Sequence, residues 1–194
     1  KTLEEPPAHA IFILATTELE KVPETIISRC QHYEFRKIST PVIMSRLAEL
    51  AKREKISADK DALRLLSLFS DGGLRDAESM LGQVIAGREK LTADDVRLVL
   101  GAPKEEQVLG FLEALLAKNL AIAARVVNET IDQGTDPQAY LKMIIRTARH
   151  LLLSRLDKEE TARIASELSD DEQAFLQKHT EDASVPELTQ MIKS

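Results

Sequence analysis

Cysteine and aromatic residues are scarce in this sequence. Among 194 residues there is one cysteine, there is no tryptophan, and aromatic residues make up 4%. A single cysteine excludes an internal disulfide framework and a cysteine-rich zinc site, and it fits a reducing, cytoplasmic environment. Because aromatic residues are so few, the core must consist mainly of leucine, isoleucine, valine and alanine. That composition favours packed helices over a β-sandwich.

Long apolar runs and an excess of positive charge are also missing. No apolar run approaches the roughly 18 residues that a membrane span needs, and the start does not resemble a signal peptide. The net charge is −6, so the chain as a whole lacks the basic surface typical of nucleic-acid binding. We therefore expect no membrane contact, and any contact with DNA must be local or made by a larger assembly.

The motifs of a self-contained catalytic site are absent as well. Neither G-x-x-x-x-G-K-[ST] nor G-x-G-x-x-G occurs, so the sequence has no glycine-rich loop for nucleotide phosphates. The four histidines are not at metal-ligand spacing, and no metal site is expected. No Ser/His/Asp or Cys/His nucleophile set is apparent. The paired acids at 94–95 and 170–171 lie at predicted helix starts, where the helix dipole explains them.

The segment from residue 11 to residue 36 predicts a small α/β unit. Ile11–Ala15 is a continuous apolar run, which is typical of a strand buried on both faces. It ends in Thr16-Thr17-Glu18, at the strand end where ligands bind in open α/β sheets, although a solvated loop explains these residues equally well. Pro23 begins a short predicted helix that runs to Cys30. Residues 31–36 alternate in polarity like a half-buried strand.

The sequence of residues 40–102 predicts packed helices, because apolar residues there recur every three or four positions instead of every two. Thr40-Pro41 is a suitable helix start, Asp71-Gly72-Gly73 interrupts the pattern, Thr92-x-x-Asp95 predicts a capped start, and Gly101 predicts a stop. The predicted core stripes are Ile43/Leu47/Leu50, Ala62/Leu65/Leu66/Phe69 and Leu74/Ala77/Leu81/Val84/Ile85.

Pro103 begins a second helical group, for which three long amphipathic helices are predicted. Gly134 ends the second of them, and Asp136-Pro137 opens the third. Shorter helices follow, one with Ile164 and Leu168, and two starting at Ser169-x-x-Glu172 and near Ser184-x-x-Glu187. The predicted stripes of the long helices are Val108/Phe111/Leu112/Leu115, Ala123/Val126/Val127/Ile131 and Leu141/Ile144/Ile145/Ala148/Leu152.

Two arginines occupy settings that suit contact with a phosphate. Arg29 lies near the end of the short predicted helix and precedes a predicted strand, in Ser28-Arg29-Cys30. Arg75 opens a helix directly after Gly72-Gly73-Leu74 and lies off the core stripe of that helix. A guanidinium donates hydrogen bonds in a fixed fork, which suits phosphate oxygens. Taken singly, such an arginine is more often a surface salt-bridge partner.

Together, these motifs resemble a known family. Thr2–Pro7 (TLEEPP), Phe12–Thr17 (FILATT), Pro23–Cys30 (PETIISRC) and Gly73–Ala77 (GLRDA) closely resemble the bacterial clamp loader ATPases, the gamma/tau subunits of DNA polymerase III in the AAA+ class. All four motifs lie in the first half of the chain. The second half is similar only as a helical segment of suitable length and position.

The resemblance implies roles for individual residues. Thr17 occupies the sensor 1 position, which reads the terminal phosphate of ATP in the same subunit, and Thr16 is the next candidate. Arg29 matches the arginine finger, which reaches ATP in the neighbouring subunit. Arg75 matches the sensor 2 arginine of the lid, and Leu74 lies where the lid touches its own nucleotide.

The resemblance also implies an organisation. It makes residues 1–38 the end of an AAA+ nucleotide-binding domain, residues 39–102 a helical lid, and residues 103–194 a helical collar that joins subunits in a ring of five. The fold class expected is thus mainly α, with a small α/β remnant. The expected partners are other loader subunits and, through the assembly, the sliding clamp and primer-template DNA.

ATP and magnesium are expected only in a longer protein. The sequence begins at a lysine in mid-pattern, so we expect it to be a fragment, and the phosphate loop and metal-binding acidic strand of the family have no counterpart in it. The parent protein is expected to be an ATPase. The chain alone is expected neither to bind ATP tightly nor to hydrolyse it. Two alternatives stay open: a sister subunit that keeps the arginine finger without being an ATPase, and a plain helical scaffold.

Overall fold

The computed structural model describes residues 7–156, 164–165 and 168–180, and the chain divides into two units, residues 1–36 and 37–194. Each unit is described separately. The predicted helix end at residues 1–5, the predicted helix near residue 184 and most of the helix predicted around Ile164 lie outside the described residues.

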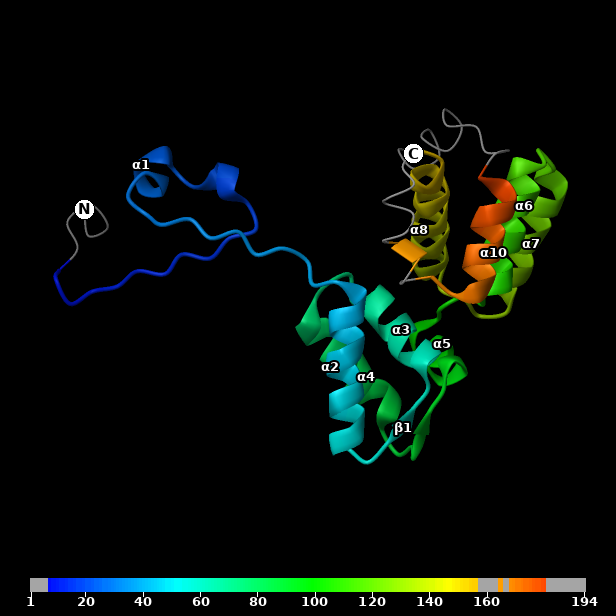
Figure 1. Cartoon of the computed structure of the whole chain (residues 1–194), viewed down its shortest axis with the longest axis horizontal. Coiled ribbons are helices and arrows are strands. Elements are labelled where there is room, and N and C mark those ends of the chain that lie inside the picture. The colour runs from blue at the N-terminus through cyan, green and yellow to red at the C-terminus, as the bar shows by residue number, and fades with distance from the viewer. Residues whose placement is uncertain (1–6, 157–163, 166–167, 181–194) are drawn as a thin grey trace. The chain divides into compact units, whose positions relative to one another are not determined.

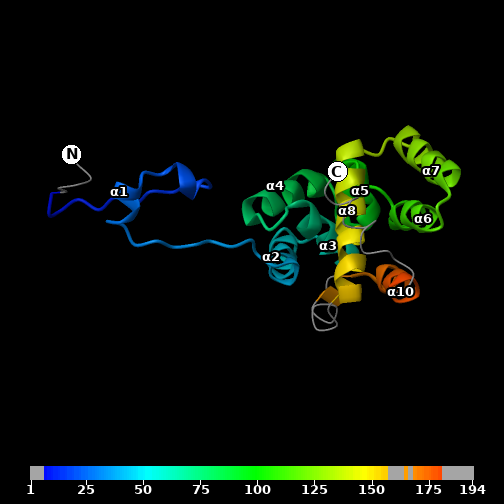
Figure 2. The same cartoon turned by 90° about the horizontal axis from the view of Figure 1, so that it is seen from above.

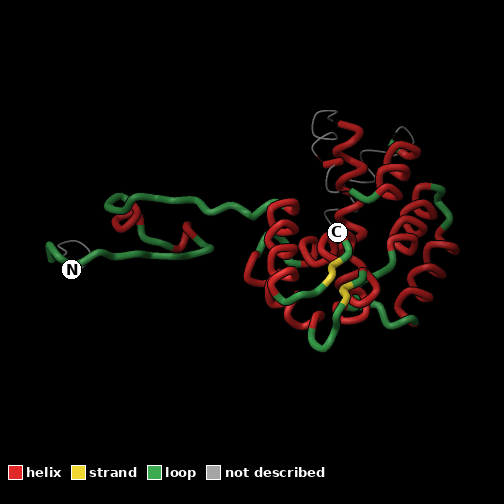
Figure 3. Tube along the Cα trace, turned by 60° about the horizontal axis from the view of Figure 1, so that its bottom comes forward, coloured by secondary structure: helices red, strands yellow, loops and turns green. Residues whose placement is uncertain are grey.

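Residues 7–36 of the first unit form loops with two short helical turns, η1 (Leu19–Lys21) and α1 (Glu24–Ile27), as Figure 3 shows. Pro23 immediately precedes α1, where its fixed φ favours helix entry, so the predicted helix forms but ends at Ile27. None of the described residues of this unit is buried.

The two strands predicted in this unit are not formed, and this prediction was wrong. Ile11 and Ile13 of the apolar run are 89% and 91% exposed, and Phe35 of the second segment is 95% exposed. A strand is stable only when its backbone N–H and C=O groups pair with a neighbour. No described residue pairs with either segment, so both remain loops despite their strand-like sequence.

The first helical group comprises α2 (Thr40–Arg53), α3 (Lys60–Phe69), α4 (Leu74–Ile85) and α5 (Ala93–Leu100), which pack together in Figure 1. Pro41 lies in the first turn of α2, as predicted, where the missing N–H has no cost. Most of the core comes from the predicted stripes, and Leu91 and Val96 add to it, whereas Leu50, Phe69, Leu74 and Ile85 of these stripes are only partly buried. The fully buried members of the core are Ile43, Leu47, Ala62, Leu66, Ala77, Val84, Leu91 and Val96.

This group also contains a strand pair that periodicity did not reveal. β1 (Ser57–Ala58) and β2 (Lys90–Leu91) pair in parallel, with Ala58 opposite Leu91. Two residues are too few for an alternating pattern to be recognised. The pair ties the α2–α3 connection to the α4–α5 connection, and it places Leu91 in the core.

The second helical group comprises α6 (Glu105–Leu116), α7 (Leu120–Asp132), α8 (Pro137–Leu156) and α10 (Asp170–His179). Figures 1 and 2 show α6 and α7 side by side, and α6 and α10 also pack on α8. Its core contains Val108, Leu112, Tyr140, Met143, Ile144, Ala148, Leu151, Phe175 and Leu176.

The stripe predicted for α8 is partly wrong. Leu141 is 56% exposed, whereas Tyr140 and Met143 are buried. The helix is therefore rotated by about one residue from the predicted register. The Tyr140 hydroxyl donates to the Gln107 carbonyl at 3.1 Å, and its ring lies edge-on to Phe111, with centroids 6.1 Å apart. These contacts with α6 favour the observed face.

The prediction of a mainly helical chain is confirmed. The start of α5 has the predicted capping box of Thr92 and Asp95, and Gly101 ends this helix with φ of 60°. The start of α10 has the predicted box of Ser169 and Glu172. Within the described ranges, no helix is both long enough and apolar enough to cross a membrane.

Candidate nucleotide-sensing site

The turn before α4 fixes the position of Arg75 in the first turn of that helix. Asp71 and Gly72 have positive φ values of 50° and 83°, and the Gly73 N–H donates to the Ser70 carbonyl at 2.8 Å. A Cβ on Gly72 would lie 2.6 Å from the Cβ of Lys37, so this close approach requires glycine. The Lys37 ammonium pairs with Asp71 at 2.6 Å, which lowers the pKa of that carboxyl through a hydrogen bond and charge attraction.

Arg75 itself is exposed, and the described structure gives its guanidinium no hydrogen bond or ion pair. Glu78, one helical turn further on, is the natural partner for it. However, Glu78 accepts a hydrogen bond from Arg46 of α2 at 3.0 Å, and this bond raises the pKa of Arg46. Arg75 therefore lies on a helix whose start is fixed by the preceding turn, and no described residue pairs with its guanidinium donors. Leu74 is half-buried and packs against the core of the first helical group.

Arg29, Thr16 and Thr17 lie in the first unit, and all three are exposed. Among the described residues, the Arg29 guanidinium donates only to the carbonyl of Thr25, four residues earlier. The Thr16 hydroxyl accepts a hydrogen bond from the Glu18 N–H at 3.0 Å and so closes a local turn. The structure thus brings Leu74 and Arg75 together on one helix start, and it places the other three candidates in a separate unit.

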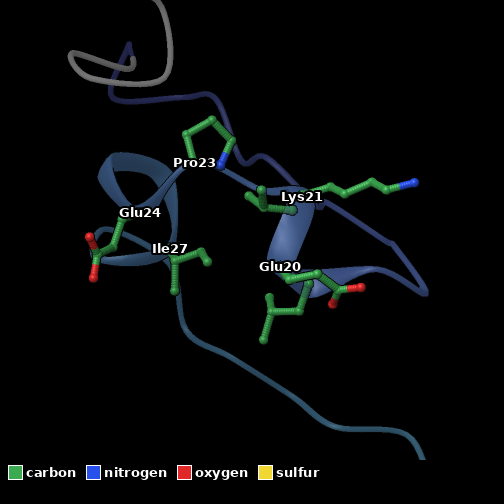
Figure 4. Close-up of a pocket in the computed structure, with 7 residues that line it drawn as sticks. Glu20, Lys21, Pro23, Glu24 and Ile27 are labelled. Atoms are coloured by element: carbon green, nitrogen blue, oxygen red, sulfur yellow. The ribbon is translucent and has the colours of Figure 1, made fainter.

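A hollow in the first unit lies between η1 and α1, and Figure 4 shows the side chains around it. Glu20, Lys21 and Glu24 point in different directions in this view, so their charged ends do not converge on a ligand. None of the candidate site residues lines the hollow. Within the part of the chain that the structure describes, no group of three or more His, Cys, Asp or Glu residues could hold a metal ion.

A buried charge network is the feature that sequence reasoning missed. Glu172 of α10 is 2% exposed, and its two carboxylate oxygens pair with Arg64 of α3 at 2.9 Å and Arg146 of α8 at 2.6 Å. Arg64 also lies 3.5 Å from Glu105 at the start of α6. The sequence showed only the capping role of Glu172. Its arginine partners are 108 and 26 residues away, and no local pattern joins them.

The pKa values of the two carboxyls in this network are shifted in opposite directions. Burial by itself would raise the pKa of Glu172, but the charges of Arg146 and Arg64 outweigh burial and hold that pKa below its usual value. Glu105 is less fully paired, and its burial raises its pKa despite a hydrogen bond from Ser169. Glu172 is therefore the anion that neutralises the buried arginines.

Comparison with known families places the chain in a class. Residues 42–89 match the model of the DNA polymerase III clamp loader subunit ATPase lid domain, and residues 1–39 match a model of the DNA polymerase III delta subunit. Residues 91–193, more than half of the chain, match the model of domain III of the DNA polymerase III gamma and tau subunits. The chain therefore belongs to the gamma and tau subunit family of DNA polymerase III clamp loaders.

Individual relatives agree with this assignment. The tau subunit of DNA polymerase III from Bacillus subtilis is 39% identical over 154 residues, which cover 79% of this chain and 27% of the relative. The Escherichia coli tau subunit is 33% identical over 157 residues, covering 80% of this chain and 24% of the relative. Protein STICHEL-like 1 of Arabidopsis thaliana is 38% identical over 137 residues, covering 71% and 12%. The chain thus spans about a quarter or less of each of these relatives.

Proposed function

We propose that this chain belongs to the motor subunit of an ATP-driven sliding-clamp loader, and that Arg75 senses ATP bound to its own subunit. The observation that carries the proposal is the exposed guanidinium of Arg75, which no described residue pairs with, on a helix start fixed by Gly72, Lys37 and Asp71. Its rigid fork of donors fits the oxygens of a terminal phosphate. Leu74, next to it, contributes apolar contact with the nucleotide.

Arg29 acts as the arginine finger on ATP held by a neighbouring subunit. It is exposed, and its one contact with a described residue is a backbone carbonyl of its own turn, so it can exchange that contact for a phosphate oxygen. An arginine donated in trans stabilises the charge of a transferring phosphoryl group, which is worth roughly 10³ to 10⁵ in rate in small GTPases. Thr17 reads the terminal phosphate from the same subunit as sensor 1, and Thr16 is the second candidate for this role.

ATP and magnesium are held by a longer form of the protein. The described residues offer guanidinium and hydroxyl donors for phosphate, but they offer no carboxylate cluster for a metal ion. The ring of five loader subunits forms through the collar predicted for residues 103–194. Within that region, Leu120 of α7 and Leu156 of α8 are 72% and 63% exposed, so each is available for contact with a neighbour. The sliding clamp and primer-template DNA are engaged by the full assembly.

A sister subunit of the loader without ATPase activity is the second candidate. The match of residues 1–39 to a delta subunit model favours it for the first unit. The lid and domain III matches favour the motor subunit, and so does Arg75, because a sensor 2 arginine acts only beside bound ATP. A plain helical scaffold, in which both arginines are ordinary surface residues, is the third reading.

The test uses Arg29→Ala and Arg75→Ala in the full-length subunit assembled into its loader. Each is expected to lower DNA-dependent ATP turnover by about two orders of magnitude or more, because each removes a phosphate contact. Arg36→Ala and Arg53→Ala are matched controls, since both remove exposed arginines and should leave turnover unchanged. Unchanged turnover in the Arg29 and Arg75 variants would support the scaffold instead.

Mixing experiments separate the two roles. Addition of subunits with a normal arginine finger should restore turnover at the nucleotide site of an Arg29→Ala subunit, because a normal neighbour supplies the finger for that site. An Arg75→Ala defect should stay with the variant's own nucleotide site. Rescue of Arg75→Ala by neighbours would contradict its role as a sensor in its own subunit. Turnover by the purified 194-residue chain would contradict the expectation that its nucleotide cradle lies elsewhere.

A further inference from the structure

We propose that the Arg64–Glu172–Arg146 network is a joint that makes the first and second helical groups open as one cooperative unit. The network is independent of the proposed nucleotide contacts, because none of its residues is a candidate sensor or finger. It joins one helix of the first group, α3, to α8 and α10 of the second. Glu105 adds α6 to the same network.

The burial of the network exceeds what helix capping needs. In the α10 cap, the Glu172 carboxylate accepts a hydrogen bond from the Ser169 N–H, and the Glu172 N–H donates to the Ser169 hydroxyl. Such a cap functions at an exposed helix end. Here the side chains of Glu172, Arg64 and Arg146 are only 2%, 10% and 16% exposed. Buried ion pairs contribute little net stability, whereas loss of one partner is strongly destabilising. Such a network therefore favours the one arrangement of helices in which every buried charge has its partner.

Two further contacts between the groups support the joint. Lys142 of α8 donates to the Phe69 carbonyl at 3.0 Å, where α3 ends, and its ammonium lies 5.5 Å from the centroid of the Phe69 ring. The Asp136 N–H donates to the Gly101 carbonyl at 2.9 Å. Apolar packing continues across the same boundary, since Leu68 and Phe69 of α3 pack against the core of the second group. Hydrogen bonds and apolar packing thus join the two groups in addition to the charge network.

The covalent connection between the groups is itself buried. Ala102 is 7% exposed and Pro103 is buried, although both belong to the connection between α5 and α6. A flexible linker between independent domains is instead exposed and polar. A Cβ on Gly101 would lie 2.9 Å from the Cβ of Asp136, which leaves this connection little room to move. The boundary therefore has the properties of a rigid joint.

The experiment is hydrogen exchange of the 194-residue chain, followed by mass spectrometry over a series of urea concentrations. It reports the opening of α2–α4 and of α8 separately within one molecule. In the unmodified chain, the slowest amides of both groups are expected to share one opening equilibrium and one urea dependence. Two separate openings in the unmodified chain would overturn the proposal.

Glu172→Gln then removes the charge that joins the groups. It should separate the two openings and increase exchange from α3 by on the order of a hundredfold, because the buried guanidiniums of Arg64 and Arg146 lose the carboxylate that they share. A uniform increase, with both groups still opening together, would overturn the proposal, since the network would then be a stabilising contact and no joint. Glu78→Gln in the first group and Glu113→Gln in the second remove ion pairs within one group and should leave the openings coupled.

Arg64→Lys keeps the measurement decisive if Glu172→Gln does not fold. Lysine retains the positive charge and an apolar stem, so the variant should fold, but a single ammonium cannot bridge Glu105 and Glu172 as the guanidinium does. We expect it to separate the two openings as well. Openings that stay identical in Arg64→Lys would contradict the proposal.

Discussion

At the residue scale, buried polar side chains differ in whether their polar atoms have a hydrogen-bond or ion-pair partner. The Glu172 carboxylate has two arginine partners and a backbone N–H. His150 of α8 is 9% exposed, and its Nδ1 has no hydrogen-bond partner within the described structure. Its burial and the charge of Arg146 lower its pKa from 6.5 to about 4. This histidine is therefore neutral in the folded protein at pH 7.

His150 makes the folded protein sensitive to acid. The unfolded state binds a proton near pH 6.5, while the folded state resists it down to about pH 4. Above about pH 6.5, the stability of the protein therefore does not depend on this group. Below that pH, the protein's free energy of unfolding falls as the pH drops toward 4. The loss approaches about 3 kcal/mol. His150→Gln should remove that part of the pH dependence, as measured by urea unfolding between pH 7 and pH 4.

The exposed His32 provides the matched control. His32→Gln should leave the pH dependence of unfolding as it is in the unmodified chain. A proton NMR titration that gives His150 a pKa near 6.5 would contradict the assigned burial effect, and so would an unchanged acid dependence in His150→Gln.

At the element scale, side-chain caps define several helix starts. Thr92 accepts from the Asp95 N–H at 3.3 Å, and the Thr92 N–H donates to the Asp95 carboxylate at 2.9 Å. The hydroxyl and N–H of Thr92, together with Arg88, lower the pKa of Asp95. By contrast, Ser39 precedes α2 without any side-chain cap. The two positions allow the contribution of a cap to be measured within one fold.

Thr92→Ala should lower the free energy of unfolding by about 1 kcal/mol, since it leaves the Asp95 N–H in the first turn of α5 without its acceptor. Ser39→Ala should change it by less than about 0.5 kcal/mol, because no cap hydrogen bond is lost. Urea unfolding of the two variants at neutral pH measures both values. Equal effects would show that the Thr92 hydroxyl contributes nothing as a cap.

At the scale of the whole molecule, the buried residues that the structure describes all come after Lys37. None of residues 7–36 is buried, and their described backbone hydrogen bonds are local turns. The apolar side chains of Ile11, Ile13 and Phe35 are almost fully exposed, so they contribute little to the stability of the fold.

Removal of residues 1–36 should therefore leave the free energy of unfolding within about 0.5 kcal/mol of the value for the whole chain. Limited trypsin digestion should cut first at Lys21, Arg29 or Arg36, which are exposed in this unit. Urea unfolding of residues 37–194 beside the whole chain makes the comparison. A loss above about 1 kcal/mol would contradict the independence of the two units.

Prediction from sequence succeeded where the deciding interactions are local. The helices of the first group, the Thr92–Asp95 and Ser169–Glu172 caps, and the glycine stop at Gly101 depend on residues within a few positions of each other. The stripe of α8 was misjudged because Leu141 and Tyr140 both fit an apolar face, and contact with α6 selects between them. The strand-like segments in residues 11–36 have the correct composition, but a strand also requires a partner.

By itself, the sequence determined the helical class, the helix starts and the exposed position of Arg75, because periodicity, caps and glycine turns act over short distances. It also carried the motifs by which the family is recognised. Only the tertiary structure decided that Arg64, Arg146 and Glu172 meet in a buried network, and that residues 7–36 contribute no core. Electrostatic pairing and burial depend on residues far apart in the chain, and no local pattern encodes which of them will meet.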